Sequence, residues 1–200
     1  MSFLKYKDCM IQPTALAPLP VVIVLAAGRG ERFLASGGAT HKLQALLAGK
    51  AVIDHTLDAV KASGLACHVV AADASRSGMG DSIAAGVRAT PLANGWLILP
   101  ADLPLIRAET LRQIAVAPAS QVTVPVVRGQ RGHPVRFARS CQQHLLGLHG
   151  HQGAAAVIKA LEATDSVAFI NLDDIGCITD VDTLADLQSA QNLYDLLVSR

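Results

Sequence analysis

The sequence predicts an α/β fold in which helices cover both faces of a mainly parallel β-sheet. Short runs of apolar, often β-branched residues alternate along the chain with segments whose apolar residues recur at helical spacing. The first such run, residues 21–25, leads directly into the small residues Ala26, Ala27 and Gly28. In open sheets of this kind ligands bind just beyond the carboxyl ends of the strands, so this turn is the first candidate for a binding site.

The composition is that of one globular domain. The chain has 200 residues, of which 51% are hydrophobic and 16% are charged, which is enough apolar material for a sizeable core. Residues 1–20 are rich in proline and lack periodicity, so we expect a flexible N-terminal tail followed by a single domain over residues 21–200. The net charge of +1 gives no general attraction to nucleic acid or to acidic membranes.

Two further features bear on where the protein is found. No apolar run approaches the ~20 residues that a membrane span needs, and Lys5, Lys7 and Asp8 interrupt any signal peptide. The cysteines are scattered and form no C-x-x-C pair; they are Cys9, Cys67, Cys141 and Cys177. This pattern favours reduced thiols and a cytoplasmic protein that binds no membrane.

We expect a strand at each short apolar run that is bounded by turn-forming residues. These strands cover residues 21–25, 67–72, 96–99, 122–127, 134–137 and 167–170. Pro125 lies inside one of these runs and predicts a sheet edge or a bulge there, because proline cannot donate a hydrogen bond to a neighbouring strand.

Helices are expected where apolar residues recur at helical spacing. They cover residues 51–63, 79–89, 107–116, 141–146 and 154–161, with a terminal helix after Thr183. Gly64 suits the end of the first of these helices, since glycine readily adopts a left-handed conformation. Asp81 or Ser82 is expected to cap the start of the second.

The turn after the first strand combines small residues with positive charge. Its small residues let backbone N–H groups approach a ligand closely, and Arg29, Arg32 and Lys42 are cationic, which predicts a polyphosphate site. A dinucleotide-binding G-x-G-x-x-G loop is excluded because Phe33 stands at the third glycine position. A P-loop is excluded because Leu43 follows Lys42 where serine or threonine is needed.

Acidic residues at two distant points are candidate metal ligands. Asp102 follows a buried strand and lies between two prolines that restrict its backbone. Mg²⁺ in proteins is held by one or two carboxylates together with phosphate oxygens, so Asp102 is the first candidate. Asp180 and Asp182 share one face of an extended segment, and either could be the second ligand, although Asp182 or Thr183 could equally cap the last helix.

Three motifs resemble those of the MobA-like nucleotidyltransferases. Residues 25–32 read L-A-A-G-R-G-E-R and resemble that family's L-A-A-G-x-G-x-R loop, which a lysine follows downstream, here Lys42. Residues 78–83 read G-M-G-D-S-I and resemble its G-M-x-S-S-L segment, which borders the base and ribose. Residues 180–187 read D-V-D-T-L-A-D-L and resemble its D-I-D-T-P-E-D-L segment, which points to Asp182 as the metal ligand, with Asp180 as second choice.

A fourth motif resembles one branch of that family. Residues 131–137 read R-G-H-P-V-R-F and resemble the R-G-H-P-V-x-F of the molybdenum cofactor cytidylyltransferases. This resemblance implies that the acceptor substrate is bound by Arg131, Gly132, His133 and Pro134. Ala27 also fits the cytidylyl branch, because the guanylyl branch usually has L-A-G-G at the first turn.

The family resemblance implies a Rossmann-like three-layer α/β/α fold of the nucleotide-diphospho-sugar transferase type and a Mg²⁺-dependent reaction. CMP would pass from CTP to the phosphate of a molybdopterin-type cofactor with release of pyrophosphate, and GTP is the second choice of nucleotide. The implied catalytic residues are Arg32 and Lys42, and the implied metal ligands are Asp102 and Asp182. The implied nucleotide-binding residues are Leu25, Ala26, Ala27, Gly28, Arg29, Gly30, Gly80 and Ser82. A molybdoenzyme or its chaperone is a further implied partner.

The sequence departs from the family pattern at three points. Residues 34–41 lengthen the segment before Lys42, and one βα unit is missing between Gly64 and Gly78. Residues 150–155 lack the family's G-D-x-G-A-R, so an acceptor contact made there would be changed or absent.

Several alternative functions stay open at this point. A guanylyltransferase for the same cofactor would use the same site. A sugar-phosphate nucleotidyltransferase shares the chemistry but generally needs a longer chain, and a glycosyltransferase could use Asp180 and Asp182 as its metal pair. A cofactor-binding protein without turnover would fit the missing βα unit and the altered residues 150–155.

Overall fold

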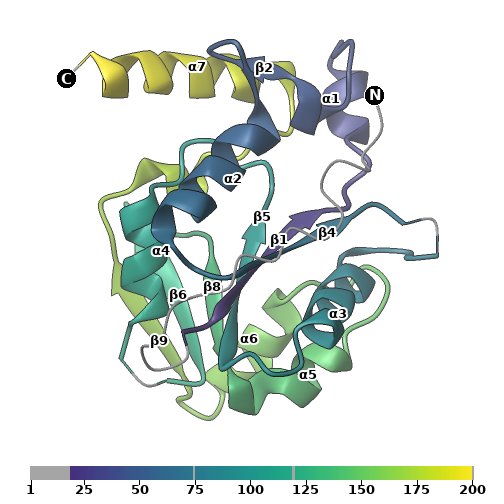
Figure 1. Cartoon of the computed structure of the whole chain (residues 1–200), viewed down its shortest axis with the longest axis vertical. Coiled ribbons are helices and arrows are strands. Elements are labelled where there is room, and N and C mark those ends of the chain that lie inside the picture. The colour runs from purple at the N-terminus through teal and green to yellow at the C-terminus, as the bar shows by residue number, and fades with distance from the viewer. Residues whose placement is uncertain (1–18, 74, 119, 200) are drawn as a thin grey trace.

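The computed structural model describes residues 19–73, 75–118 and 120–199, so the tail predicted for residues 1–20 lies almost wholly outside the described residues. Within that part of the chain, the central sheet has the strand order β4-β1-β5-β8-β6-β7, with β9 paired to β6 (Figure 1). Its strands are β1 (Val21–Ala26), β4 (Cys67–Ala71), β5 (Gly95–Pro100), β6 (Val122–Val127), β7 (Gln130–Arg131), β8 (Val135–Ala138) and β9 (Val167–Asn171).

Most of these strands run in one direction. β1 pairs in parallel with β4 and with β5, and β6 pairs in parallel with β9. β8 is the reversed strand between β5 and β6, since it is antiparallel to both. β5 and β6 therefore point the same way, and the prediction of a mainly parallel sheet is confirmed.

Helices cover both faces of the sheet, so the predicted three-layer arrangement is confirmed (Figure 1). Alternate residues of β1 face opposite cores: Val22 and Val24 belong to one, and Ile23 to the other. The first core is covered by α2 (Val52–Ser63), α4 (Ala108–Ala115) and α7 (Leu184–Val198), and the second by α3 (Met79–Ala89), α5 (Gln142–Leu146) and α6 (Ala155–Glu162).

The α2–β4 connection fits the predicted loss of one βα unit. α2 ends at Gly64, which has the expected left-handed conformation with φ 73°. The chain then enters β4, the strand at one end of the sheet order.

Among the described residues, no helix has the length and apolar character that crossing a bilayer requires.

The expected cap of α3 is wrong, and so is the expectation of a sheet edge at Pro125. α3 is capped by Gly78, not by Asp81 or Ser82, because the helix begins at Met79 and takes both residues into its first turns. Pro125 does not mark a sheet edge, because β6 pairs with β9 on one side and with β8 and β7 on the other. On that second side the pairing breaks between Thr123 and Val126, so the missing N–H of proline falls where neither β8 nor β7 is paired.

Several short elements have no counterpart in the expected set. They are α1 (Glu31–Ala35), the antiparallel pair β2 (Leu46–Leu47) and β3 (Lys50–Ala51), the two-residue strand β7, and the 3₁₀ turns η2 (Lys42–Gln44), η3 (Arg139–Cys141) and η4 (Ile175–Ile178). The chain folds back at α1 after the first turn, and Phe33 is the buried side chain of this helix. Residues 34–41 therefore return Lys42 to the mouth of the sheet.

Candidate functional site

A cleft of about 850 Å³ lies at the carboxyl ends of β1, β4 and β5. The predicted site residues that line it are Leu25, Ala27, Gly28, Arg29, Gly30, Arg32, Lys42, Ser82, Asp102, Arg131, His133 and Asp182. Those that do not line it are Ala26, Gly80, Gly132 and Pro134, each of which adjoins a residue that does. The structure thus gathers the predicted segments around one cleft.

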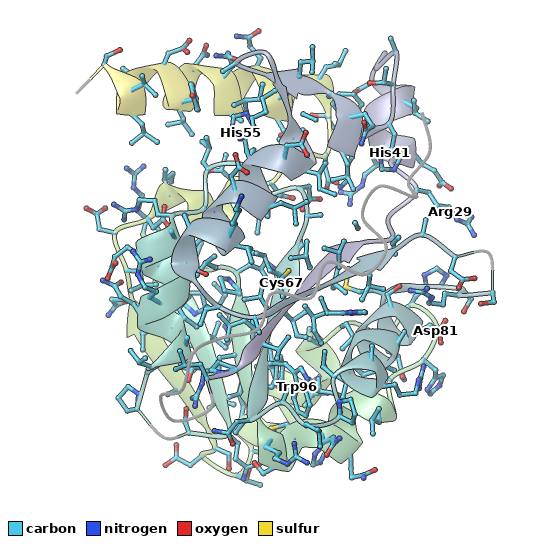
Figure 2. The ribbon with its side chains drawn as sticks, in the orientation of Figure 1. Arg29, His41, His55, Cys67, Asp81 and Trp96 are labelled. Atoms are coloured by element: carbon cyan, nitrogen blue, oxygen red, sulfur yellow. The ribbon has the colours of Figure 1, made fainter. Side chains whose placement is uncertain are left out.

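The turn after β1 is held by a histidine that the sequence did not single out. Gly30 has a left-handed backbone with φ 67°, and a Cβ added there would lie 3.1 Å from the ring of His41. Nε2 of His41 donates to the carbonyl oxygen of Gly28 at 2.8 Å, while Nδ1 accepts from the N–H of Leu43 at 3.3 Å. Figure 2 shows His41 beside this turn, and Arg29 pointing outward. His41 therefore joins the turn to the segment that carries Lys42.

Lys42 lies between two carboxylates from distant parts of the chain. Its Nζ atom is 2.5 Å from Oδ2 of Asp102 and 2.5 Å from Oδ1 of Asp182. A guanidinium nitrogen of Arg32 lies 2.8 Å from the other oxygen of Asp182. The backbone also ties the two acidic segments together, since the N–H of Val181 donates to the carbonyl oxygen of Asp102 at 3.0 Å.

The charges in this cluster influence one another. Burial opposes the positive charge of Lys42, but Asp102 and Asp182 outweigh it, so the pKa of Lys42 lies above its ordinary value. Burial, with smaller contributions from the Asp102 and Asp182 carboxylates, raises the pKa of Asp180. Asp180 lines the same cleft, so a further acidic side chain stands beside the pair.

The two carboxylates that bind Lys42 suit a divalent cation. Oxygens from Asp102 and Asp182 already converge on one positive charge, and Oδ1 of Asp102 is buried without a hydrogen-bond partner among the described residues. The described part of the chain holds no cluster of three or more acidic, histidine or cysteine side chains that could hold a metal ion. A site with two carboxylates and otherwise substrate or water oxygens is the arrangement that Mg²⁺ favours.

His133 brings a buried imidazole to the same cleft. Its backbone N–H donates to the carbonyl oxygen of Cys177 at 2.9 Å, and its Nδ1 has no partner among the described residues. Burial lowers the pKa of His133, and the nearby charges of Asp102 and Asp180 only partly offset this effect. The ring also donates a hydrogen bond to the backbone of Ile98, so the free Nδ1 of the neutral imidazole can accept a hydrogen bond from a ligand.

The residues on either side of His133 fix its position. A Cβ at Gly132 would lie 2.7 Å from the carbonyl oxygen of Cys177, so only glycine allows this approach. A guanidinium nitrogen of Arg131 lies 2.7 Å from the Glu162 carboxylate, and its guanidinium carbon lies 4.8 Å from the centre of the Phe169 ring. Arg131 is thus held in place while it lines the cleft.

The start of α3 forms another wall and is packed against residues 149–152. The N–H of Gly80 donates to the carbonyl oxygen of Gly150 at 2.9 Å, and a Cβ at Gly80 would lie 2.7 Å from the carbonyl oxygen of Gln152. This packing accounts for a glycine at position 80. The Ser82 hydroxyl donates to the carbonyl oxygen of Gly78 at 3.3 Å within the same wall.

Asp81, labelled on α3 in Figure 2, connects the parts of this wall. One carboxylate oxygen accepts from the N–H and the hydroxyl of Ser77 at 2.9 and 2.8 Å. The other accepts from the N–H of Gly150 at 3.2 Å. The Ser77 hydroxyl, followed by the Gly150 N–H, lowers the pKa of Asp81. Asp81 was expected only as a helix cap, and its link to Gly150 had no signal in the sequence.

Comparison with known proteins identifies relatives of this chain. The sequence profile of the MobA-like NTP transferase domain matches residues 22–166. Purine catabolism protein PucB of Bacillus subtilis is 29% identical over 111 residues, which make up 54% of this chain and 54% of PucB. The chain therefore spans about half the length of that curated relative.

Solved structures share the fold over nearly the full chain. Rv0371c from Mycobacterium tuberculosis is 26% identical, with a TM-score of 0.69, over 86% of this chain and 98% of its own. The same protein has also been solved in complex with manganese. Mth528, a nucleotidyl transferase from Methanothermobacter thermautotrophicus, is 22% identical, with a TM-score of 0.75, over 91% of this chain and 99% of its own.

Proposed function

This chain belongs to the MobA-like NTP transferase family, and we propose that it transfers CMP from CTP to the phosphate of a molybdopterin-type cofactor, with Mg²⁺ and with release of pyrophosphate. The observation that carries the proposal is the convergence of Lys42, Asp102 and Asp182 in the cleft beside the turn at residues 28–30. Phosphoryl-centre substitution depends on positioning and on stabilising charge, and this arrangement can supply both.

In the proposed complex, the backbone of residues 25–30 holds the nucleotide, with Gly80 and Ser82 supporting the wall opposite. Arg32 and Lys42 offset the charge of the β and γ phosphates and of the leaving pyrophosphate. The side chain of Arg32 is 77% exposed, so it can move from Asp182 to a phosphate at little cost. Lys42 already lies in the cleft, where its Nζ contacts the carboxylates of Asp102 and Asp182. To bind the nucleotide, Nζ would replace these carboxylate contacts with contacts to phosphate oxygens.

Asp102 and Asp182 are the proposed ligands of Mg²⁺. When bound, the ion would supply Lewis-acid polarisation at the α phosphate and neutralise charge that develops there. The manganese complex of Rv0371c supports a divalent cation in this fold. Asp180 lines the same cleft and is the second choice for the ligand position given to Asp182.

The proposed acceptor site lies around residues 131–134. His133 offers a nitrogen without a partner among the described residues, and Arg131 contributes positive charge at the cleft. The acceptor phosphate is already anionic, so its attack needs alignment rather than a strong general base. The likeness of residues 131–137 to the cofactor cytidylyltransferases supports a molybdopterin-type acceptor, and a molybdoenzyme or its chaperone is the proposed recipient of the product.

The deciding experiment measures pyrophosphate release by the purified protein with Mg²⁺ and molybdenum cofactor. We expect release with CTP, much less with GTP, ATP or UTP, and release about 10²- to 10³-fold slower when Asp102 is changed to Asn. Release with GTP alone would replace the proposal with guanylyl transfer. Release that needs a sugar phosphate, or cofactor binding without any release, would overturn it.

A further inference from the structure

The loop between β4 and α3 carries a charged pair to which the proposed function gives no role. Nη2 of Arg76 donates to Oδ2 of Asp73 at 3.1 Å, and both residues line the cleft. Nη1 of Arg76 is shielded from solvent and has no hydrogen-bond partner among the described residues. Because arginine keeps its proton, this N–H needs an acceptor, and a bound ligand can supply one.

Asp73 holds the arginine in place. One oxygen of Asp73 accepts from the N–H and the hydroxyl of Ser75 at 2.9 and 2.7 Å, which leaves the other for Arg76. The Ser75 hydroxyl in particular lowers the pKa of Asp73 to about 2, so the carboxylate is ionised at neutral pH. The Arg76 side chain is only 23% exposed, unlike the exposed side chains of Arg29 and Arg32 in the first turn.

The position of the pair suits the base end of a nucleotide. β4 lies beside β1 and runs parallel to it, so the loop after β4 lies at the same sheet edge as the turn at residues 28–30. Ser77 and Gly78, which follow Arg76, also line the cleft, and Asp81 holds Ser77 through two hydrogen bonds. Arg32 and Lys42, the proposed phosphate-binding cations, line the part of the cleft formed by the segment after β1, whereas Asp73 and Arg76 line the part formed by the loop after β4.

We propose that Asp73 and Arg76 read the hydrogen-bonding edge of the nucleobase and that together they select cytosine. Cytosine presents an amino donor at N4 next to the acceptors N3 and O2, which match a carboxylate beside a guanidinium fork. Uracil and guanine present an acceptor where cytosine has its amino group, followed by an N–H donor. In both bases the acceptor would face the Asp73 carboxylate and the donor would face the Arg76 guanidinium, so neither base would bind well. Adenine matches only the first two positions. This inference rests on the proposed function, since it names the residues that select the nucleotide of that site.

The test titrates wild type, Arg76→Ala and Arg88→Ala with CTP, UTP and inorganic tripolyphosphate in the presence of Mg²⁺, by calorimetry. Arg88 is a matched control, because it is an exposed arginine near the far end of α3. We expect Arg76→Ala to weaken CTP binding by about 10- to 100-fold, as loss of a bidentate base contact does, and to leave tripolyphosphate binding unchanged. Unchanged tripolyphosphate binding also shows that the variant is folded.

Further measurements separate the outcomes. Arg76→Lys keeps the charge without the fork, so it should lose the preference for CTP over UTP while binding tripolyphosphate normally. Equal weakening of CTP and tripolyphosphate would assign Arg76 to the phosphates and overturn the inference, as would a CTP preference that survives in Arg76→Ala. Wild type that selects CTP but transfers no CMP would defeat the proposed function and leave the base selection standing.

Discussion

Lys42 and Asp102 are 60 positions apart in the sequence, yet Nζ of Lys42 lies 2.5 Å from Oδ2 of Asp102. The same nitrogen lies 2.5 Å from Oδ1 of Asp182. The lysine thus stands where the two carboxylates converge, which is the point proposed for a divalent cation. Two positive charges cannot share that point, so the lysine and the metal compete unless phosphate draws the lysine away.

Replacing Lys42 should therefore separate metal binding from turnover. We expect Lys42→Met to bind free Mn²⁺ several-fold more tightly than wild type, because no ammonium has to be displaced, and to lose at least a hundredfold in kcat. Mn²⁺ affinity is measured by electron paramagnetic resonance without nucleotide. Lys61→Met, at the exposed end of α2, is the control and should behave as wild type. Weaker Mn²⁺ binding in Lys42→Met would mean that the lysine positions the carboxylates instead.

Asp102→Asn should sharply reduce turnover while leaving the fold intact. The amide has nearly the same shape but lacks the charge that holds Lys42 and the proposed metal, so we expect kcat to fall by about 10²- to 10³-fold. Pyrophosphate release and melting temperature are measured together. Asp165→Asn, in an exposed turn, is the matched control. Activity retained in Asp102→Asn would remove this residue from the metal site.

Two glycines of the cleft should respond differently to alanine. A Cβ at Gly28 meets nothing within 4 Å, so Gly28→Ala should melt as wild type does and lose nucleotide affinity, because the new methyl group faces the proposed triphosphate. A Cβ at Gly80 would lie 2.7 Å from backbone atoms of His149 and Gln152. Gly80→Ala should therefore cost roughly 1–3 kcal/mol of stability as well as affinity. The measurements are denaturant unfolding and CTP titration; a Gly80→Ala variant of native stability would contradict the packing argument.

Stability should depend on pH through Asp81. Hydrogen bonds from Ser77 and then Gly150 lower the pKa of Asp81 below its ordinary value of 3.8. Asp81 therefore binds a proton more readily in the unfolded chain than in the folded one. Its contribution to stability is complete above the pKa of Asp81 in the unfolded chain and is lost as the pH falls through its pKa in the folded protein. Asp81→Asn should lower the melting temperature at pH 7, with the difference from wild type shrinking below pH ~4. Ser77→Ala should show a smaller loss of melting temperature with the same dependence on pH. A difference in melting temperature between Asp81→Asn and wild type that does not change with pH would exclude this role of Asp81.

The sequence was sufficient for the long elements and for the edge at which the site lies. The strand and helix bounds agree with the structure to within one residue at each end, because each long element has a clear period and a turn-forming neighbour. α1, β7 and the β2–β3 pair were missed, since five- and two-residue elements are too short to show any period. Their formation depends on burial of Phe33 and on tertiary contacts.

The contacts inside the site could not be predicted in the same way. Asp102 was assigned to the metal from its strand-end position, and Asp182 from its extended segment and from family likeness, but nothing local indicated that Lys42 would lie between them. His41 adjoins Lys42, yet its bond to Gly28 depends on how residues 31–40 fold back. Contacts of this kind depend on tertiary structure, for which periodicity and spacing carry no information.

The reversed strand β8 has a consequence for how such a site can change. Because β8 runs against β5 and β6, the residues that precede it arrive at the same rim as the residues that follow β5. Residues 131–134 and Asp102 thus meet there from opposite chain directions. The hairpin at residues 128–131 can therefore vary in length or sequence without disturbing the parallel strands that carry the other half of the cleft. The proposed acceptor site could thus change in related proteins while the proposed nucleotide site on the parallel strands is kept.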